Sequence, residues 1–283
     1  MNQVKVERFG PFPQVSRPVF MVSAALIVGF IVFGALFNEV AAALFSELQS
    51  MITHRFRWLF VILMNSALVF SLYLALSRFG DIRLGQQTEH PEYSLLSWFS
   101  MLFSAGIGIG LLYWGTAEPL YHFMAPPMGQ AQTVEAAKQA MNLSFLHWGL
   151  HAWALYCVVA LALAYFHYRR GLPLSIRSVL YPLLGQKIYG KWGHVVDILA
   201  VFGTMFGVVT SLGLGVMQIN AGFSSVLGIP NNITVQLGLI AFITLMATLS
   251  VMMGLDKGIK RLSDINILLT MLLLAFMIFL GPT

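Results

Sequence analysis

The stretch SAGIGIGLLYWGTAEP, residues 104–119, lies inside a segment apolar enough to cross a bilayer, yet it carries Gly106, Gly108, Gly110 and Gly115. A glycine in a helix interior costs up to about 1 kcal/mol relative to alanine. Inside a membrane, backbone groups freed from a helix are tolerated only where they line a protein cavity or bind a ligand. The stretch therefore predicts either a broken helix at a transporter binding site or a small-residue seam between two closely packed helices.

Composition places the chain among integral membrane proteins. Of its 283 residues, 58% are hydrophobic and only 10% are charged, whereas a soluble domain carries about 25% charged residues. The net charge of +5 follows the membrane loops, so we expect no nucleic-acid partner. The single cysteine, Cys157, excludes a disulfide framework and a thiol metal cluster. No short apolar core precedes a small-residue cleavage site, and we expect no cleaved signal peptide.

Seven apolar segments are long enough to span a bilayer, which takes about 20 residues. We expect them near residues 19–37, 58–76, 98–123, 143–167, 195–216, 235–253 and 265–280. The third contains the glycine stretch. Between the third and fourth lies a polar loop, 126–142, in which VEAAKQAM has helix-forming composition.

Lysine and arginine placement predicts the orientation. Thirteen of the sixteen fall on the inner side if the N-terminus is cytoplasmic, and the outer loops hold Arg55, Arg57 and Lys138. A seven-helix receptor usually has its N-terminus outside, so this bias counts against that class.

The segment GLPLSIRSVLYPLLGQKIYG, residues 171–190, is basic, amphipathic and interrupted by two prolines. It is too short to span, and we expect it to lie along the inner membrane interface. Basic residues there are usually lipid anchors, so we expect Arg177 to contact headgroups rather than to gate the inner side.

The fourth segment carries HWGLHAWALY, residues 147–156. On a continuous helix Trp148, Tyr156 and Trp153 fall within about 140° of one another. Such a stripe is typical of helix packing or an interfacial belt, and it is also typical of a site that binds a quaternary ammonium group by cation–π attraction. His147 and His151 share another face and would be two metal ligands, but no further ligand cluster accompanies them.

Polar groups within the spans form a third set of candidates. Glu118 should face a cavity or partner, or else hydrogen-bond a nearby backbone break. Asp197 suits the first turn of a helix. Thr204, Thr210 and Ser211 offer oxygen ligands for a hard cation, although small hydroxyls in membrane helices more often bond to their own backbone or to a neighbouring helix.

Four motifs occur in order along the chain: MLFSAGIGIGLLYWGTAEPLYHF, FLHWGLHAWALY, YRRGLPLSIRSVLYPLLG and VFGTMFGVVTSLGLGVMQIN. Together they strongly resemble the betaine–choline–carnitine transporters, above all the bacterial choline and glycine betaine members. The resemblance implies an all-α, twelve-helix secondary transporter of the bacterial inner membrane with the LeuT-type inverted-repeat fold, typically a homotrimer. On that template residues 1–97 hold the N-terminal tail and two leading helices, and residues 98–283 hold the first five-helix repeat. The second repeat is absent, so we expect that the chain does not transport alone.

The resemblance also implies roles for single residues. Trp148, Trp153 and Tyr156 match aromatics near the trimethylammonium site. The glycine stretch, with Gly106, Gly108 and Gly110, matches the unwound helix that contacts substrate. Backbone carbonyls of Ser104 and Ile107 would bind a sodium ion, and Thr204 would offer a hydroxyl to a second one.

The coupling ion stays open between sodium and proton. Gly110 occupies a position that is glycine in sodium-coupled betaine carriers and aspartate in proton-coupled choline carriers. Sodium-coupled members of the family have two threonines four apart at the second sodium site, and here Thr204 is followed by Val208. We therefore expect a symporter for a trimethylammonium compound such as glycine betaine or choline, with no cofactor beyond the coupling ion and no enzymatic activity. The alternative is a seven-helix, membrane-embedded metal enzyme or receptor.

Overall fold

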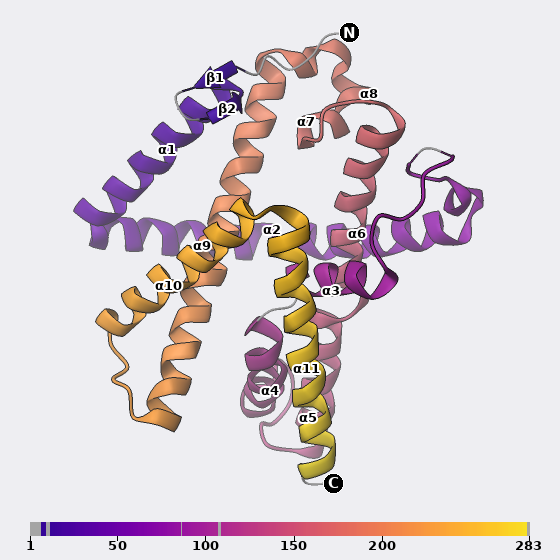
Figure 1. Ribbon diagram of the computed structural model, residues 1–283. Coiled ribbons are helices and arrows are strands. Elements are labelled where there is room, and N and C mark those ends of the chain that lie inside the picture. Colours follow the sequence, from indigo (N-terminus) through magenta and orange to yellow (C-terminus); the bar gives the residue numbers. More distant parts are fainter. Residues whose placement is uncertain (1–6, 10–11, 86, 107–108, 282–283) are drawn as a thin grey trace. The chain divides into compact units, whose positions relative to one another are not determined.

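The computed structural model describes residues 7–9, 12–85, 87–106 and 109–281 (Figure 1). A short antiparallel hairpin of β1 (Glu7–Phe9) and β2 (Phe12–Val15) opens the chain. The other described elements are helices, and six helical stretches are long and apolar enough to cross a membrane. The expected all-α membrane architecture is confirmed, although the hairpin was not predicted.

Helical stretches correspond to six of the seven predicted spans, and several of them extend well beyond the predicted bounds. They are α1 (Arg17–Leu36), α2 (Asn38–Leu76), α5 (Val134–Trp148), α6 (Leu150–Ala164), α9 (Lys191–Leu227), α10 (Ile233–Met252) and α11 (Lys260–Leu280). The third expected span is occupied by α3 (Leu95–Gly106) and α4 (Ile109–Met124). Short helices lie between them: η1 (Arg78–Asp81), η2 (Tyr165–Arg169), α7 (Ile176–Val179), α8 (Tyr181–Leu184), η3 (Gly185–Tyr189) and η4 (Leu255–Ile259).

Two regions expected as loops are helical. Helix α2 has 39 residues, so Arg55 and Arg57 lie within a helix rather than in an outer loop. Residues 38–57 contain neither glycine nor proline and are rich in alanine, leucine and glutamate, which are strong helix formers. The helix-forming composition of VEAAKQAM likewise gives the start of α5.

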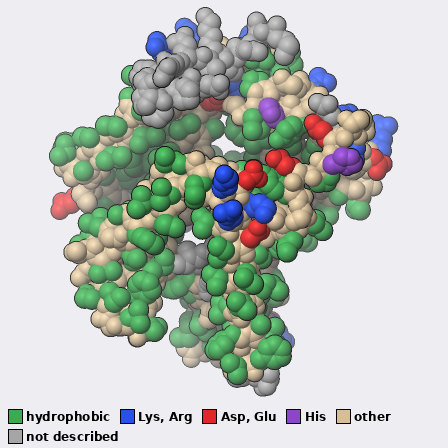
Figure 2. Space-filling view, in the orientation of Figure 1, with side chains coloured by type: hydrophobic (Ala, Val, Ile, Leu, Met, Phe, Trp, Pro, Cys, Tyr) green, Lys and Arg blue, Asp and Glu red, His purple; other side chains and the backbone are tan. Residues whose placement is uncertain are grey.

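The chain divides into two compact units. The first comprises residues 1–89 and 147–207, and within it α2 packs along α6. The hydroxyl of Ser71 donates to the carbonyl of Ala154 at 3.5 Å across that helix pair. The second unit comprises residues 90–146 and 208–283, and within it α3 packs along α11. Hydrophobic side chains cover most of the visible helical surface (Figure 2), as expected where helices face lipid.

The connection from α10 to α11 requires glycine at two places. Gly254 has φ +80°, a left-handed conformation that side chains rarely adopt. Gly258, in η4, lies so close to α10 that a Cβ atom there would be 1.9 Å from the carbonyl oxygen of Ser250. This close approach is what brings the end of α10 against the start of α11.

We expect Gly258→Ala to lower the melting temperature of the purified protein, because overpacking against backbone costs about 1–3 kcal/mol. Gly238→Ala is the matched control, since a Cβ atom at Gly238 in α10 would meet nothing within 4 Å. Thermal unfolding in detergent compares the two. Equal melting temperatures for both variants would contradict the packing argument.

Candidate functional site

The glycine stretch lies where α3 ends and α4 begins. Gly106 is the last residue of α3 and Gly110 lies in the first turn of α4. Ile107 and Gly108, two of the predicted site residues, lie outside the described residues. Ser104 occupies the last turn of α3, two residues before Gly106.

The side chain of Ser104 is held by a residue that the sequence reasoning missed. Asn266 on α11 donates from Nδ2 to the hydroxyl oxygen of Ser104 at 3.0 Å. The residues are 162 positions apart, and a lone asparagine in an apolar span gives no sign of its partner. A polar side chain in such a span nevertheless marks a place where a neighbouring helix must supply a hydrogen bond.

Glu118 is buried in α4, with 7% of the residue exposed. Its Oε1 atom lies 3.7 Å from Nε2 of His122, one turn further along the helix. The structure thus gives this carboxylate a side-chain partner on its own helix, which is one of the arrangements expected for an acid in an apolar segment.

The aromatic residues of the fourth segment are divided by a bend. Trp153 and Tyr156 lie together on α6, with ring centroids 6.0 Å apart and planes inclined by 43°. Trp148 ends α5, and Gly149 has a non-helical backbone (φ −87°, ψ −147°). The continuous-helix projection is therefore wrong for Trp148, whose ring packs on that of His147 at 4.8 Å.

The two histidines have different neighbours. Nε2 of His151 lies 3.4 Å from Oδ1 of Asn65 on α2, whereas His147 lies beside Trp148. Asn65 also borders a cavity of about 410 Å³ on α2, lined by Asn65, Ser66, Val69, Phe70 and Tyr73. Among the described residues there is no group of three histidine, cysteine or acidic side chains that could hold a metal ion.

The hydroxyl of Thr204, the predicted ligand on α9, donates to the carbonyl of Ala200 at 2.9 Å. This is the common arrangement for a threonine in a membrane helix. Val208 lies one turn further on in the same helix.

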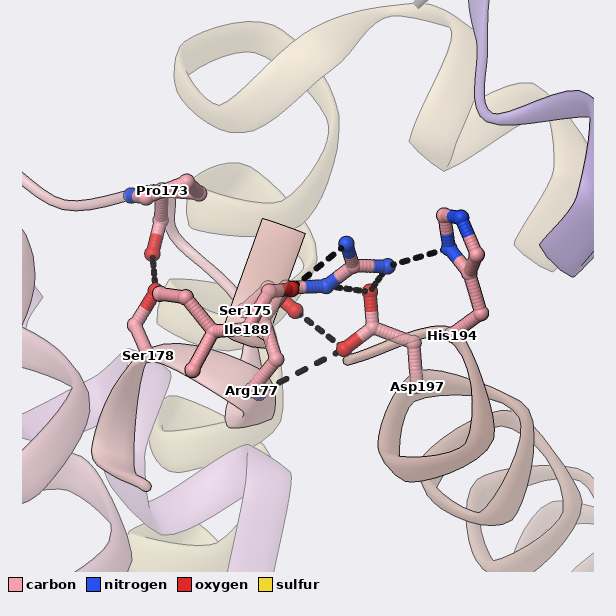
Figure 3. A network of polar contacts seen from close by, with 7 residues as sticks. All are labelled: Pro173, Ser175, Arg177, Ser178, Ile188, His194 and Asp197. Carbon is pink, nitrogen blue, oxygen red and sulfur yellow. Dashed lines mark hydrogen bonds and ion pairs between the residues drawn. The ribbon is translucent and has the colours of Figure 1, made fainter. Parts of the chain in front are cut away.

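Arg177 is the centre of a buried polar network in the first unit (Figure 3). The residue is fully buried, and its Nε and Nη2 atoms lie 2.7 and 2.6 Å from Oδ2 of Asp197. Nη1 donates to the carbonyl of Ile188 at 3.2 Å, and Ser175 donates to Oδ1 of Asp197 at 2.5 Å. Nη2 also lies 3.4 Å from Nδ1 of His194.

This network corrects two expectations. Arg177 is not an anchor in the headgroups, and Asp197 is more than a favourable residue in a first helical turn, because each is the other's counter-ion. Gly193 makes the arrangement possible: a Cβ atom there would lie 1.7 Å from the carbonyl oxygen of Ile188. The segment 171–190 is thereby fastened to the start of α9.

Comparison with known proteins identifies the family. A family model for the betaine/carnitine/choline family transporters (BCCT) matches residues 18–283. This chain belongs to that family. The resemblance noted from the four sequence motifs is confirmed.

Several BCCT relatives are similar over nearly the whole chain. This chain is 45% identical over 272 residues to a glycine betaine transporter of Acinetobacter baylyi. It is 44% identical over 270 residues to a high-affinity choline transport protein of Escherichia coli, and 45% identical over 266 residues to a glycine betaine transporter of Bacillus subtilis. These matches cover 94–96% of this chain but only 40–52% of the relatives' own length.

We expect Asp197→Asn to destabilise this BCCT chain by about 3–5 kcal/mol, because it leaves a buried guanidinium without its counter-ion. The double variant Arg177→Met, Asp197→Leu removes both charges and should be less destabilised than Asp197→Asn alone. Thermal unfolding of the purified protein measures both.

Asp264→Asn is the control, since it breaks a more exposed pair, Lys260–Asp264 at 3.3 Å, and exposed pairs contribute about 0–1 kcal/mol. A loss for Asp197→Asn no larger than for Asp264→Asn would show that the buried pair does not stabilise the first unit.

Proposed function

We propose that this chain is the first part of a secondary active symporter that imports a quaternary ammonium solute such as glycine betaine or choline. Membership of the BCCT family supports transport, and relatives at 44–45% identity are named glycine betaine and choline transporters. The alternative of a seven-helix metal enzyme or receptor is not proposed, because the family match is to transporters.

The observation that carries the choice of substrate is the ring pair of Trp153 and Tyr156. A trimethylammonium group has no N–H to donate, so it is bound by ring faces through cation–π attraction rather than by hydrogen bonds. Two rings 6.0 Å apart on one membrane helix present such faces. Trp148 is proposed as a third contact, approached from the other side of the bend at Gly149.

The same proposal covers the rest of the site. The glycine stretch, through Gly106, Gly108 and Gly110, would contact substrate, and Ser104, Ile107 and Thr204 would contribute to ion binding. Residues 1–97 would form the tail and leading helices and 98–283 the first five-helix repeat of a LeuT-type fold. The full-length protein would be a homotrimer in the bacterial inner membrane. The concentration of lysine and arginine on one side supports a cytoplasmic N-terminus.

The test of transport uses the chain in full-length form, joined to the remaining part of the Acinetobacter baylyi glycine betaine transporter; we call this protein the full-length carrier. Proteoliposomes are given labelled glycine betaine or choline under separately imposed sodium and proton gradients. We expect betaine uptake that follows sodium, as Gly110 favours. Choline uptake that follows protons would mean that Val208 predicts the coupling ion better than Gly110 does. Uptake of neither solute under either gradient would refute the proposal.

We expect Trp153→Ala in the full-length carrier to raise the KM for uptake about 30-fold, because a desolvated cation–π contact contributes about 2 kcal/mol. Trp153→Phe should retain part of the affinity. Trp192→Ala, which removes an exposed indole at the start of α9, should leave the KM unchanged. An unchanged KM for Trp153→Ala would remove this residue from the substrate site.

A further inference from the structure

The helix pair α3 and α11 meets along two faces of matching polarity. Small or polar side chains recur at three- and four-residue spacing on α3, namely Ser97, Ser100 and Ser104. The same spacing recurs on α11, with Ser263, Asn266 and Thr270. Residues so spaced share one face of a helix, and the two helices pack against each other. Four of the six are buried, at 0–9% exposure, and Ser104 and Asn266 are half-buried.

Two of these hydroxyls bond within their own helix. Ser100 donates to the carbonyl of Leu96 at 2.8 Å, and Thr270 donates to the carbonyl of Asn266 at 2.9 Å. The amide of Asn266 instead crosses to Ser104 at 3.0 Å. This bond therefore joins α11 to the last turn of α3, immediately before the glycine stretch.

A second bond joins the segment just before α3 to η4, which precedes α11. The hydroxyl of Tyr93, just before α3, donates to Oδ1 of Asp256 in η4 at 3.0 Å. Removal of water from around the phenol, together with this hydrogen bond, raises the pKa of Tyr93 to about 12. Tyr93 thus remains a neutral donor throughout the physiological pH range.

Two attachments at different heights restrict a helix more than one does. Tyr93 and Ser104 are about ten residues apart on the α3 side, and Asp256 and Asn266 are about ten residues apart on the α11 side. A helix held by one bond can still rotate or slide, whereas one held at both ends can do neither without breaking a bond. The bond from Asn266 links the last turn of α3 to α11, and the bond from Tyr93 links the start of that segment to η4.

We propose that Asn266 is a positioning residue for the end of α3, where it fixes the backbone carbonyl of Ser104 for the coupling ion. The inference rests on the proposed function, because that carbonyl is a ligand only in an ion-coupled carrier. The ion would be bound by the main chain of residue 104, and the hydroxyl of the same residue would serve only to receive Asn266.

This division of roles gives a sharp test. Ser104→Ala keeps the backbone carbonyl and removes only the hydroxyl that accepts from Asn266. In the full-length carrier, Ser104→Ala and Asn266→Ala should each raise the ion concentration for half-maximal uptake about fivefold, the effect of losing one interhelical hydrogen bond. The double variant should be no worse than either single one, and the maximal rate should change less than the half-saturating concentration does.

Ser100→Ala is the matched control, since it deletes a buried hydroxyl on the same face that bonds only to its own helix. The exchanged pair, Ser104→Asn with Asn266→Ser, should recover part of the ion affinity. Additive effects of the two single variants, or an effect of Ser100→Ala as large as that of Asn266→Ala, would overturn the positioning role.

A second measurement does not depend on transport. Hydrogen exchange of the amides in the last turn of α3 should be faster in Asn266→Ala than in wild type or Ser100→Ala, without substrate or gradient. Unchanged exchange there would refute the positioning of α3 even if uptake fell. Faster exchange in Asn266→Ala than in wild type, in a carrier that takes up neither solute, would instead show that the attachment stands while the proposed function fails.

Discussion

A hydrocarbon environment offers no hydrogen-bond partner, and this constraint governs the described structure. Backbone groups must be paired within each helix, which is why the long apolar segments are helical. The same environment removes the usual reason for two helices to associate, because lipid tails are as apolar as leucine side chains. Association must then rely on packing and on a small number of polar contacts between helices.

Three contacts in this chain meet that description and differ in kind. Ser71 donates to the backbone of α6, Asn266 donates to a side chain of α3, and Arg177 forms an ion pair with Asp197. The first two are neutral and join apolar helices. The charged pair lies instead between a short, irregular segment and the start of α9, where carbonyl, hydroxyl and imidazole groups also surround it. A charge needs this many partners when it is buried, and a straight span facing lipid does not provide them.

The sequence allowed prediction of whatever depends on local composition. Six of the seven expected spans correspond to long helices, and the family follows from four motifs. The predictions that failed concern contacts and bends that local composition does not reveal. The basic, amphipathic character of 171–190 indicates a lipid anchor, and only folding shows that Asp197, twenty residues on, neutralises Arg177. The bend at Gly149 likewise separated Trp148 from the other two rings, because a helical projection assumes a continuity that one glycine can end.

The exposure of the ring pair bears on how a cation would be held. Tyr156 is 56% exposed, yet cation–π attraction reaches about 2 kcal/mol only when the site is desolvated. A trimethylammonium group on Trp153 and Tyr156 alone would stay in contact with solvent or lipid on its open side. Tight binding therefore requires further surface to close over these rings. The relatives are about twice as long as this chain or more, and their additional length is the natural source of that surface. On this argument the ring pair of α6 would form only one wall of the proposed substrate site, and the affinity of that site would depend on what covers it.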